Sequence, residues 1–189
     1  MTSLSDFIHR FQLQLPAQPA HLARNQRNAA VLLPIICKPE PTLLLTQRSQ
    51  NLRSHAGQIA FPGGAADPED PSLIITALRE AEEEVNIPQN EVQILGQLLP
   101  LDSSGGYRVT PVIGLIPPSL SLRTNPAEVA NMFEVPLFDV LSITHYRYLD
   151  IKRRERSHRV YFYWYQEQMI WGLTAGIIYQ LARQVQKIC

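Results

Sequence analysis

The sequence predicts an α/β fold in which helices cover both faces of a mixed β-sheet. Short apolar runs bounded by proline and glycine, typical of strands, alternate with a few segments of helical period, and no internal repeat is present. A length of 189 residues suits one ordinary domain, which buries roughly 70% of its unfolded surface. We therefore expect a single domain over residues 29–189, preceded by an N-terminal extension over 1–28 that holds a short helix.

The first half of the domain is predicted to hold three strands and one well-defined helix. Apolar residues recur at helical spacing from Pro71 to Val85. Asp70 is expected to cap this helix at its N-terminus, and Asn86 to end it in a left-handed conformation. The three strands are expected at 29–36, 42–46 and 58–61, the last ending at the Pro62-Gly63-Gly64 turn.

The second half is predicted to consist of further strands and a last helix. Pro111 lies inside one of these strands, which we therefore expect to bend or to lie at a sheet edge. Thr174 is expected to cap the last helix, which runs to about Lys187. The strands are expected at 92–101, 109–116 and 133–138, with a hairpin formed by 160–165 and 169–171.

Charge and cysteine content exclude several classes of protein. The 17 Lys and Arg balance the 17 Asp and Glu, so binding to a nucleic-acid backbone and polybasic docking to a membrane are disfavoured. Cys37 and Cys189 are far apart in sequence and predict neither a disulfide framework nor a cysteine zinc site. Without a signal peptide or a long apolar run, the chain is expected in the cytoplasm, although residues 7–27 weakly resemble an organelle transit peptide.

The neutral total hides two segregated charge clusters. Seven of the 17 acids lie between residues 67 and 84, where Arg79 is their one basic neighbour. Six of the 17 bases lie between residues 147 and 159. The first cluster suits metal ions, and the second is available to anions.

Three carboxylates of the central helix are candidate metal ligands. Glu80, Glu83 and Glu84 span about 100° of one helix flank, whereas Glu82 lies on the opposite flank. Like charges four residues apart cost a helix roughly 0.2–0.5 kcal/mol, a penalty that a divalent cation would remove. Oxygen ligands without nearby cysteine or histidine favour Mg²⁺ or Mn²⁺. The alternative is a solvated acidic face beside Arg79.

The approach to this helix indicates phosphate chemistry. Gly63 and Gly64 let the backbone come close to a metal ion or a phosphate oxygen. Arg79 lies four residues before Glu83 and can orient that carboxylate. A glycine pair beside a carboxylate trio is suited to hydrolysis of a phosphoanhydride.

These residues resemble the Nudix box. The resemblance rests on Gly64 and on the run REAEEEVNI at 79–87. It departs from the family pattern by one extra residue between Gly64 and Arg79, by Asp70 in place of an early glutamate, and by Asn86 in place of glycine. The resemblance implies the Nudix α/β/α sandwich, pyrophosphatase activity, and metal ligation by Glu80, Glu83 and Glu84.

A second segment resembles the one that marks the coenzyme A pyrophosphatase branch of Nudix hydrolases. Its matching positions are 44–49, 52–53, 55, 57–58 and 61–64, with a looser match at 171–175. The resemblance implies that the pyrophosphate bond of coenzyme A, or of a derivative, is split into 3′,5′-ADP and 4′-phosphopantetheine. The runner-up substrate is another nucleoside diphosphate derivative, such as ADP-ribose or a dinucleotide. A non-catalytic nucleotide-sensing module is disfavoured, because all three box carboxylates are present.

The resemblance also suggests roles for single residues. Glu80 and Glu83 are the catalytic candidates among the metal ligands, and the general base is left open between a box glutamate and Glu128. Guanidinium groups are suited to phosphates, and histidine can also donate to them. The expected substrate-binding residues are Arg48, Arg53, His55, Gly63 and Gly64. For the two arginines the alternative is a surface ion pair, and for His55 a structural hydrogen bond.

The basic run at 147–159 admits three interpretations. Its interleaved aromatic residues are compatible with nucleic-acid binding. A solvated loop beside a buried or dimer-interface strand is favoured, and a homodimer is left open. In the third interpretation, Lys152, Arg153, Arg154 or Arg156 contacts the 3′-phosphate of coenzyme A.

Overall fold

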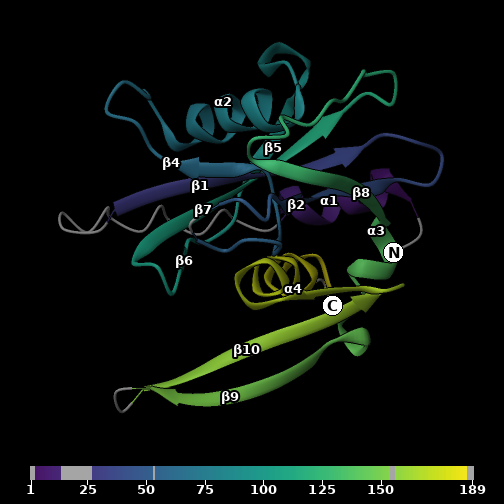
Figure 1. Cartoon of the computed structure of the whole chain (residues 1–189). Helices are drawn as coiled ribbons and strands as arrows, with labels where there is room; N and C mark the ends of the chain where they lie inside the picture. Colours follow the sequence, from purple (N-terminus) through teal and green to yellow (C-terminus); the bar gives the residue numbers. More distant parts are fainter. Residues whose placement is uncertain (1–2, 14–26, 53, 154–155, 187–189) are drawn as a thin grey trace.

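The computed structural model describes residues 3–13, 27–52, 54–153 and 156–186. Helix α2 (Leu73–Val85) covers one face of the main sheet, and α4 (Gly172–Gln186) covers the other, as Figure 1 shows. This arrangement confirms the predicted α/β/α sandwich. A second, three-stranded sheet lies beyond α4 and adds a fourth layer.

The main sheet is mixed. Its central pair, β1 (Arg27–Ile36) and β7 (Tyr107–Ile116), runs parallel over ten residues, and all other pairs are antiparallel. The strand order is β3-β2-β1-β7-β5, while β4 pairs with β1, β6 with β7 and β8 with β2. The remaining strands are β2 (Thr42–Arg48), β3 (Ile59–Ala60), β4 (Gly63–Ala65), β5 (Gln93–Gln97), β6 (Leu101–Asp102) and β8 (Val129–Pro136).

Alternating side chains of the central strands fill two cores. Leu32 and Val112 pack with α2, whereas Leu33 and Ile113 belong to the core that includes α4. Because β1 is buried on both faces, it is an almost continuous apolar run. The sheet is therefore the rigid platform on which α2 is held.

Several predicted strands differ in extent from the observed ones. The expected strand at 92–101 is divided into β5 and β6, and the strand at 133–138 begins four residues earlier, at Val129. The strand at 58–61 shrinks to Ile59–Ala60, and the Gly63-Gly64 turn forms a strand of its own, β4. The sequence did not predict β4, because glycine is disfavoured in strands. In the structure, these glycines form a strand by pairing with β1.

Pro111 lies in the interior of the sheet, so the expectation of an edge strand was wrong. Its carbonyl oxygen accepts a hydrogen bond from the N–H of Leu98, in the interruption between β5 and β6. The nitrogen of a strand residue faces the same neighbour as its carbonyl, so the missing N–H of Pro111 faces this break. The break thus makes an internal proline tolerable.

Helix α2 begins two residues later than expected, and its cap is Ser72 rather than Asp70. The Ser72 hydroxyl accepts a hydrogen bond from the N–H of Ile75 at 3.3 Å. Asn86 ends the helix with φ 57°, as predicted, and its N–H donates to the carbonyls of Ala81 and Glu82. The prediction of Asp70 failed because that carboxylate has stronger partners elsewhere.

The second sheet consists of β9 (Arg147–Arg153), β10 (Arg156–Tyr165) and β11 (Gln168–Trp171) in antiparallel order. The expected hairpin of β10 and β11 is confirmed, but the basic run at 147–159 forms strands and not a solvated loop. Tyr148, Leu149 and Ile151 alternate there with charged residues, which suits a strand. Arg154 lies outside the described residues.

Two features fix α4 and α1 (Leu4–Leu13) against the rest of the molecule. Thr174 lies inside α4 rather than at its cap, and its hydroxyl donates to the carbonyl of Ile59 at 2.9 Å. Helix α1 confirms the predicted short helix, and its Phe7 and Phe11 are buried in the core that includes α4. Short helical segments complete the fold: η1 (Gln89–Glu91), α3 (Leu137–Val140) and η2 (Ile143–His145). Within the described residues, no helix has the length and apolar character needed to cross a membrane.

Candidate active site

Glu84 is the buried centre of the candidate site. Only 2% of its surface is exposed. It lies on the flank of α2 that faces β4. The N–H of Gly63 donates to Glu84 Oε2 at 3.2 Å, and Arg48 Nη1 lies 3.7 Å from Glu84 Oε1. The sheet and the helix therefore bring residues from β2, β4 and α2 to one carboxylate.

Burial has a strong effect on the pKa of Glu84. Burial raises it to about 7, and the negative charges of Glu80 and Glu128 act in the same direction. The Gly63 hydrogen bond and the charge of Arg48 lower the pKa, but they do not offset the burial. A cation bound beside Glu84 would favour its ionised form.

Glu80 lies against the backbone of β4. A Cβ atom added to Gly64 would lie 2.5 Å from the Glu80 carboxyl carbon, so no other residue fits at position 64 without displacing that carboxylate. Burial also raises the pKa of Glu80, although hydrogen bonding from Arg79 opposes the shift. A side chain at position 64 would therefore require the Glu80 carboxylate to move.

Arg79 connects the carboxylates of the helix to the loop before it. Its Nη1 donates to Glu80 Oε1 at 2.9 Å and, more weakly, to Glu83 Oε2 at 3.4 Å. Its Nη2 reaches Asp70 Oδ2 at 3.0 Å and the carbonyl of Ala65 at 3.3 Å. The predicted orientation of Glu83 by Arg79 is therefore observed, with Glu80 as the closer partner.

Asp70 is the partner of Arg79 that the sequence interpretation missed. Its carboxylate receives two hydrogen bonds from Arg79 and a third from the Thr76 hydroxyl at 2.9 Å. The Arg79 guanidinium holds the pKa of Asp70 well below its usual range. The position of Asp70 where the family pattern has an early glutamate was the signal that could have identified it.

The carboxylates suit a divalent cation by their chemistry, but they are engaged with protein groups. Glu84 is buried and Glu80 is partly buried, both with raised pKa values, whereas the side chain of Glu83 is 54% exposed. Among the residues that the structure describes, no three acidic, histidine or cysteine side chains are placed to hold a metal ion as they stand. Binding of an ion by all three glutamates would therefore require their side chains to move closer together.

Arg48 offers an unused donor beside Glu84. It lies at the end of β2, where a register shift between Gln47 and Arg48 interrupts the pairing with β8. Its Nε is buried and has no hydrogen-bond partner among the described residues. The guanidinium is thus held near Glu84 with one donor available to a ligand.

Glu128 lies next to this group. Its carbonyl accepts a hydrogen bond from the N–H of Ser49 at 2.8 Å, which ties it to the residue after Arg48. Its negative charge raises the pKa of both Glu80 and Glu84, so its side chain is close enough to interact with each. The loop that carries Glu128 is fixed to α2 through the N–H of Asn125 and the carbonyl of Glu84.

Two predicted substrate-binding residues are not placed at the site. Arg53 lies outside the described residues. His55 is exposed, and its Nδ1 is 2.8 Å from the side-chain oxygen of Gln58 within the same loop. The structure therefore brings Arg48, Gly63 and Gly64 to the carboxylates, and gives His55 a local partner.

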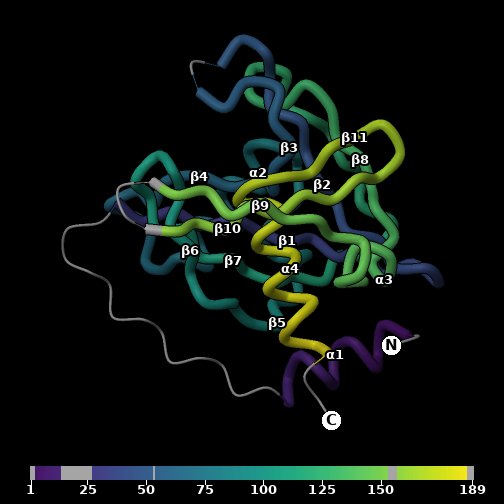
Figure 2. Tube along the Cα trace, turned by 90° about the horizontal axis from the view of Figure 1, so that it is seen from below, coloured from purple at the N-terminus to yellow at the C-terminus, as the bar shows by residue number. Residues whose placement is uncertain are grey.

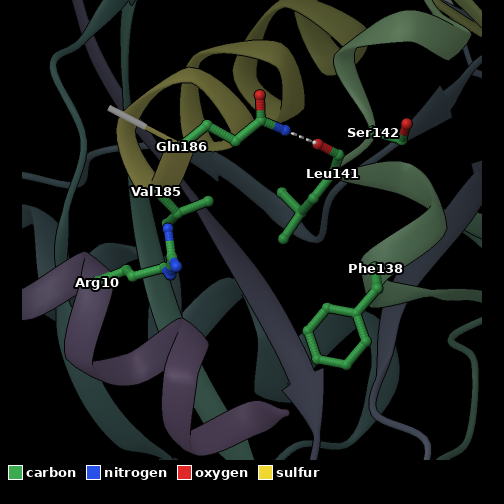
Figure 3. Close-up of a pocket in the computed structure, with 6 residues that line it drawn as sticks. All are labelled: Arg10, Phe138, Leu141, Ser142, Val185 and Gln186. Carbon is green, nitrogen blue, oxygen red and sulfur yellow. Dashed lines mark hydrogen bonds between the residues drawn. The ribbon is translucent and has the colours of Figure 1, made fainter. Parts of the chain in front are cut away.

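A separate pocket has fewer polar groups available for a phosphate than the site around Glu84. It has a volume of about 320 Å³ and lies at α1, α3 and α4 (Figure 3). Arg10 is paired with Asp6 at 2.8 Å. Figure 3 shows the Gln186 amide donating to the carbonyl of Leu141. The lining residues are Arg10, Phe138, Leu141, Ser142, Val185 and Gln186.

The chain is similar to known Nudix proteins. Residues 26–124 match the family model of the NUDIX domain. A protein of Photorhabdus laumondii described as an uncharacterized Nudix hydrolase NudL is 71% identical over 186 residues, which cover 98% of this chain and 100% of that protein. Its counterpart in Yersinia enterocolitica is 60% identical and covers 97% of this chain and 93% of its own.

Solved structures show the same fold at low sequence identity. A Caenorhabditis elegans Ap4A hydrolase in a binary complex has a TM-score of 0.51 and 22% identity, over 62% of this chain and 85% of its own. A MutT/nudix family protein from Enterococcus faecalis has a TM-score of 0.53 and 16% identity, over 98% of this chain and 71% of its own. With the family model and these relatives in agreement, the chain belongs to the Nudix hydrolase family and is a pyrophosphatase.

Proposed function

We propose that the enzyme hydrolyses the pyrophosphate bond of coenzyme A or its thioesters. Water would add across the phosphoanhydride to give 3′,5′-ADP and 4′-phosphopantetheine or its acyl form. The observation that carries this proposal is the meeting at Glu84 of the segment resembling the coenzyme A branch with the Nudix box. Arg48 and Gly63 come from that segment, and both contact the Glu84 carboxylate.

The proposed metal ligands are Glu80, Glu83 and Glu84, with Mg²⁺ or Mn²⁺ as the ion. Nudix enzymes generally use divalent metal ions, and the grouping of three glutamates on one flank of α2 supports such an ion here. When bound, the ion supplies positive charge that stabilises the negative charge developing on the phosphates. Arg79, held in place by Asp70, would be the positioning residue for Glu80 and Glu83.

The proposed substrate contacts surround the same carboxylate. The free Nε of Arg48 can donate to a phosphate oxygen, and the glycine backbone at 63–64 leaves room for close approach. Arg53 and His55 are further candidates, from the loop that follows Arg48. For the general base we retain Glu80, Glu83 and Glu128, because Glu128 interacts electrostatically with the buried carboxylates.

A single assay tests the proposal. Purified enzyme is incubated with coenzyme A, with and without Mn²⁺, and the products are identified by mass. We expect Mn²⁺-dependent release of 3′,5′-ADP and much slower turnover of ADP-ribose and of dinucleotides. If ADP-ribose or a dinucleotide is cleaved faster than coenzyme A, that compound is the substrate instead. Binding of a nucleotide without turnover under any metal would indicate a sensing module.

A further inference from the structure

The outward face of the β9–β11 sheet exposes several large apolar side chains, together with Arg147 and His158. Figure 2 looks onto this sheet from below, with α4 behind it. By strand register, Trp164 lies beside Met169, and Phe162 lies beside Trp171. We call this the outer face, and its apolar members are Leu149, Ile151, Val160, Phe162, Trp164, Met169 and Trp171.

The opposite face of the same sheet already has a cover. Tyr163 and Ile170 are buried there in the main core, and Tyr161 stacks on Tyr179 of α4 at a ring separation of 4.2 Å. A two-faced antiparallel sheet with one face in water normally alternates apolar with polar residues. This sheet instead carries apolar side chains on both faces, as a sheet does when both are covered.

The outer face is large for a surface left in water. Trp164 is 53% exposed and Leu149 57%, and Ile151, Met169 and Trp171 are each at least 40% exposed. With aromatic side chains of roughly 150–250 Å², these five expose on the order of 500 Å², near the upper end for a monomer. Phe162 stacks with Trp164 at 6.2 Å and with Trp171 at 6.5 Å, so the aromatic centre is ordered before any partner arrives.

We propose that a second copy of this chain covers the outer face, forming a twofold dimer by sheet-on-sheet packing. A stable interface buries about 800 Å² on each partner, and the apolar area of the outer face supplies the greater part of it. Tryptophan, phenylalanine and methionine are the residue types enriched in such interfaces. A twofold interface is self-complementary, so one apolar face serves as both halves of the contact.

The charges at the two ends of the sheet fit this arrangement. By strand register, Arg153 and Arg156 lie at the β9–β10 end of the outer face, and the β10–β11 turn carries the exposed Glu167. A twofold axis that lies between the two packed sheets, parallel to them and at a right angle to β10, makes the two β10 strands antiparallel. The basic end of each copy then lies toward the acidic turn of the other.

The test is the mass of the full-length protein in solution. We expect the wild-type protein to sediment at twice the chain mass at micromolar concentration. The variants Trp164→Glu and Leu149→Glu should raise the dimer dissociation constant more than about 30-fold, the effect of a central interface residue. Leu99→Glu is the matched control, because Leu99 is 47% exposed on a different surface and should leave the dimer unchanged.

Circular dichroism and coenzyme A turnover establish that the two interface variants are folded. A wild-type protein that remains monomeric at about 100 µM would overturn the proposal. Co-sedimentation of that monomer with phosphatidylglycerol vesicles, abolished by Trp164→Glu, would assign the outer face to a membrane instead. A dimer that persists in both interface variants would place the contact elsewhere and would equally overturn it.

Discussion

Arg79 donates two parallel hydrogen bonds to Asp70, from Nε to Oδ1 at 3.2 Å and from Nη2 to Oδ2 at 3.0 Å. This paired contact fixes the plane of the guanidinium, and its remaining nitrogen then points at Glu80 and Glu83. The position of the glutamates thus depends on a residue that precedes the helix.

Arg79→Lys tests the positioning role of Arg79. Lysine keeps the charge but cannot form the paired contact, so we expect turnover to fall about 10- to 100-fold. The Mn²⁺ concentration needed for half-maximal activity should rise as well. Arg159→Lys is the matched control, because Arg159 makes the same paired contact with Asp150 on the exposed β9–β10 hairpin. Equal losses in both variants would argue against a specific role for Arg79.

Glu84→Gln tests whether the buried carboxylate serves function rather than stability. The substitution removes a charge that burial disfavours, so the metal-free variant should melt no lower than the wild type. Turnover should fall about 100-fold or more, because a proposed metal ligand is lost. Glu83→Gln should lose activity as well, while Glu82→Gln, on the opposite flank, should retain it. Normal turnover in both Glu83→Gln and Glu84→Gln would disprove the ligand assignment.

Arg48→Ala tests the substrate contact. If the free Nε binds a phosphate, the KM for coenzyme A should rise about tenfold while kcat changes less. Arg48→Lys should recover little, because a lysine has no planar fork. A lower melting temperature with an unchanged KM would indicate that Arg48 serves only as an ion-pair partner of Glu84.

Gly64→Ala tests the close approach of β4 to α2. The added methyl group would meet the Glu80 carboxylate at 2.5 Å, so we expect a displaced glutamate and a strong loss of turnover. Gly105→Ala is the control, since the nearest described atom would lie 3.7 Å from its added methyl group. Comparable activity of the two variants would show that Glu80 can move without consequence.

A pH dependence of stability is expected from Glu134. Burial raises its pKa, but hydrogen bonds from Lys38 at 2.6 Å and Thr42 at 2.5 Å outweigh burial, so the folded-state pKa lies below the ordinary 4.5. Its stabilising contribution is therefore full above pH 4.5 and is lost as the pH falls through the folded-state value.

The measurement compares melting temperatures of the wild type and Glu134→Gln from about pH 7 to about pH 3. The difference should be largest at neutral pH and should shrink below about pH 4.5. Glu91→Gln, at an exposed position, should follow the wild type throughout. A difference that is constant with pH would exclude the ionised form as its cause.

The sequence predicted those features that depend on local pattern. The stripe of α2, the left-handed stop at Asn86 and the buried run of β1 follow from periodicity and residue type, and all are observed. The wrong predictions share one cause, because each depends on a contact with residues far away in the sequence. Asp70 could not be assigned to Arg79, nor Pro111 to a break in the neighbouring strands, without knowing which segments meet.

The site shows the same division between local and distant information. Helical spacing placed Glu80 and Glu84 on one flank, but the burial of Glu84 and the exposure of Glu83 depend on β4 and Arg48. The open donor of Arg48 has no sequence signal, because it results from the register shift in β2.

Strand β8 has a practical consequence for anyone who shortens the chain. The region matched by the family model ends at residue 124, whereas β8 starts at Val129 and pairs with β2 along its whole length. A fragment cut at the family boundary would leave the strand TLLLT with an open edge, the kind of edge that recruits other chains into aggregates. It would also lose Glu128. Expression trials should therefore keep the chain through at least Pro136, and insoluble shorter fragments would say nothing about the full enzyme.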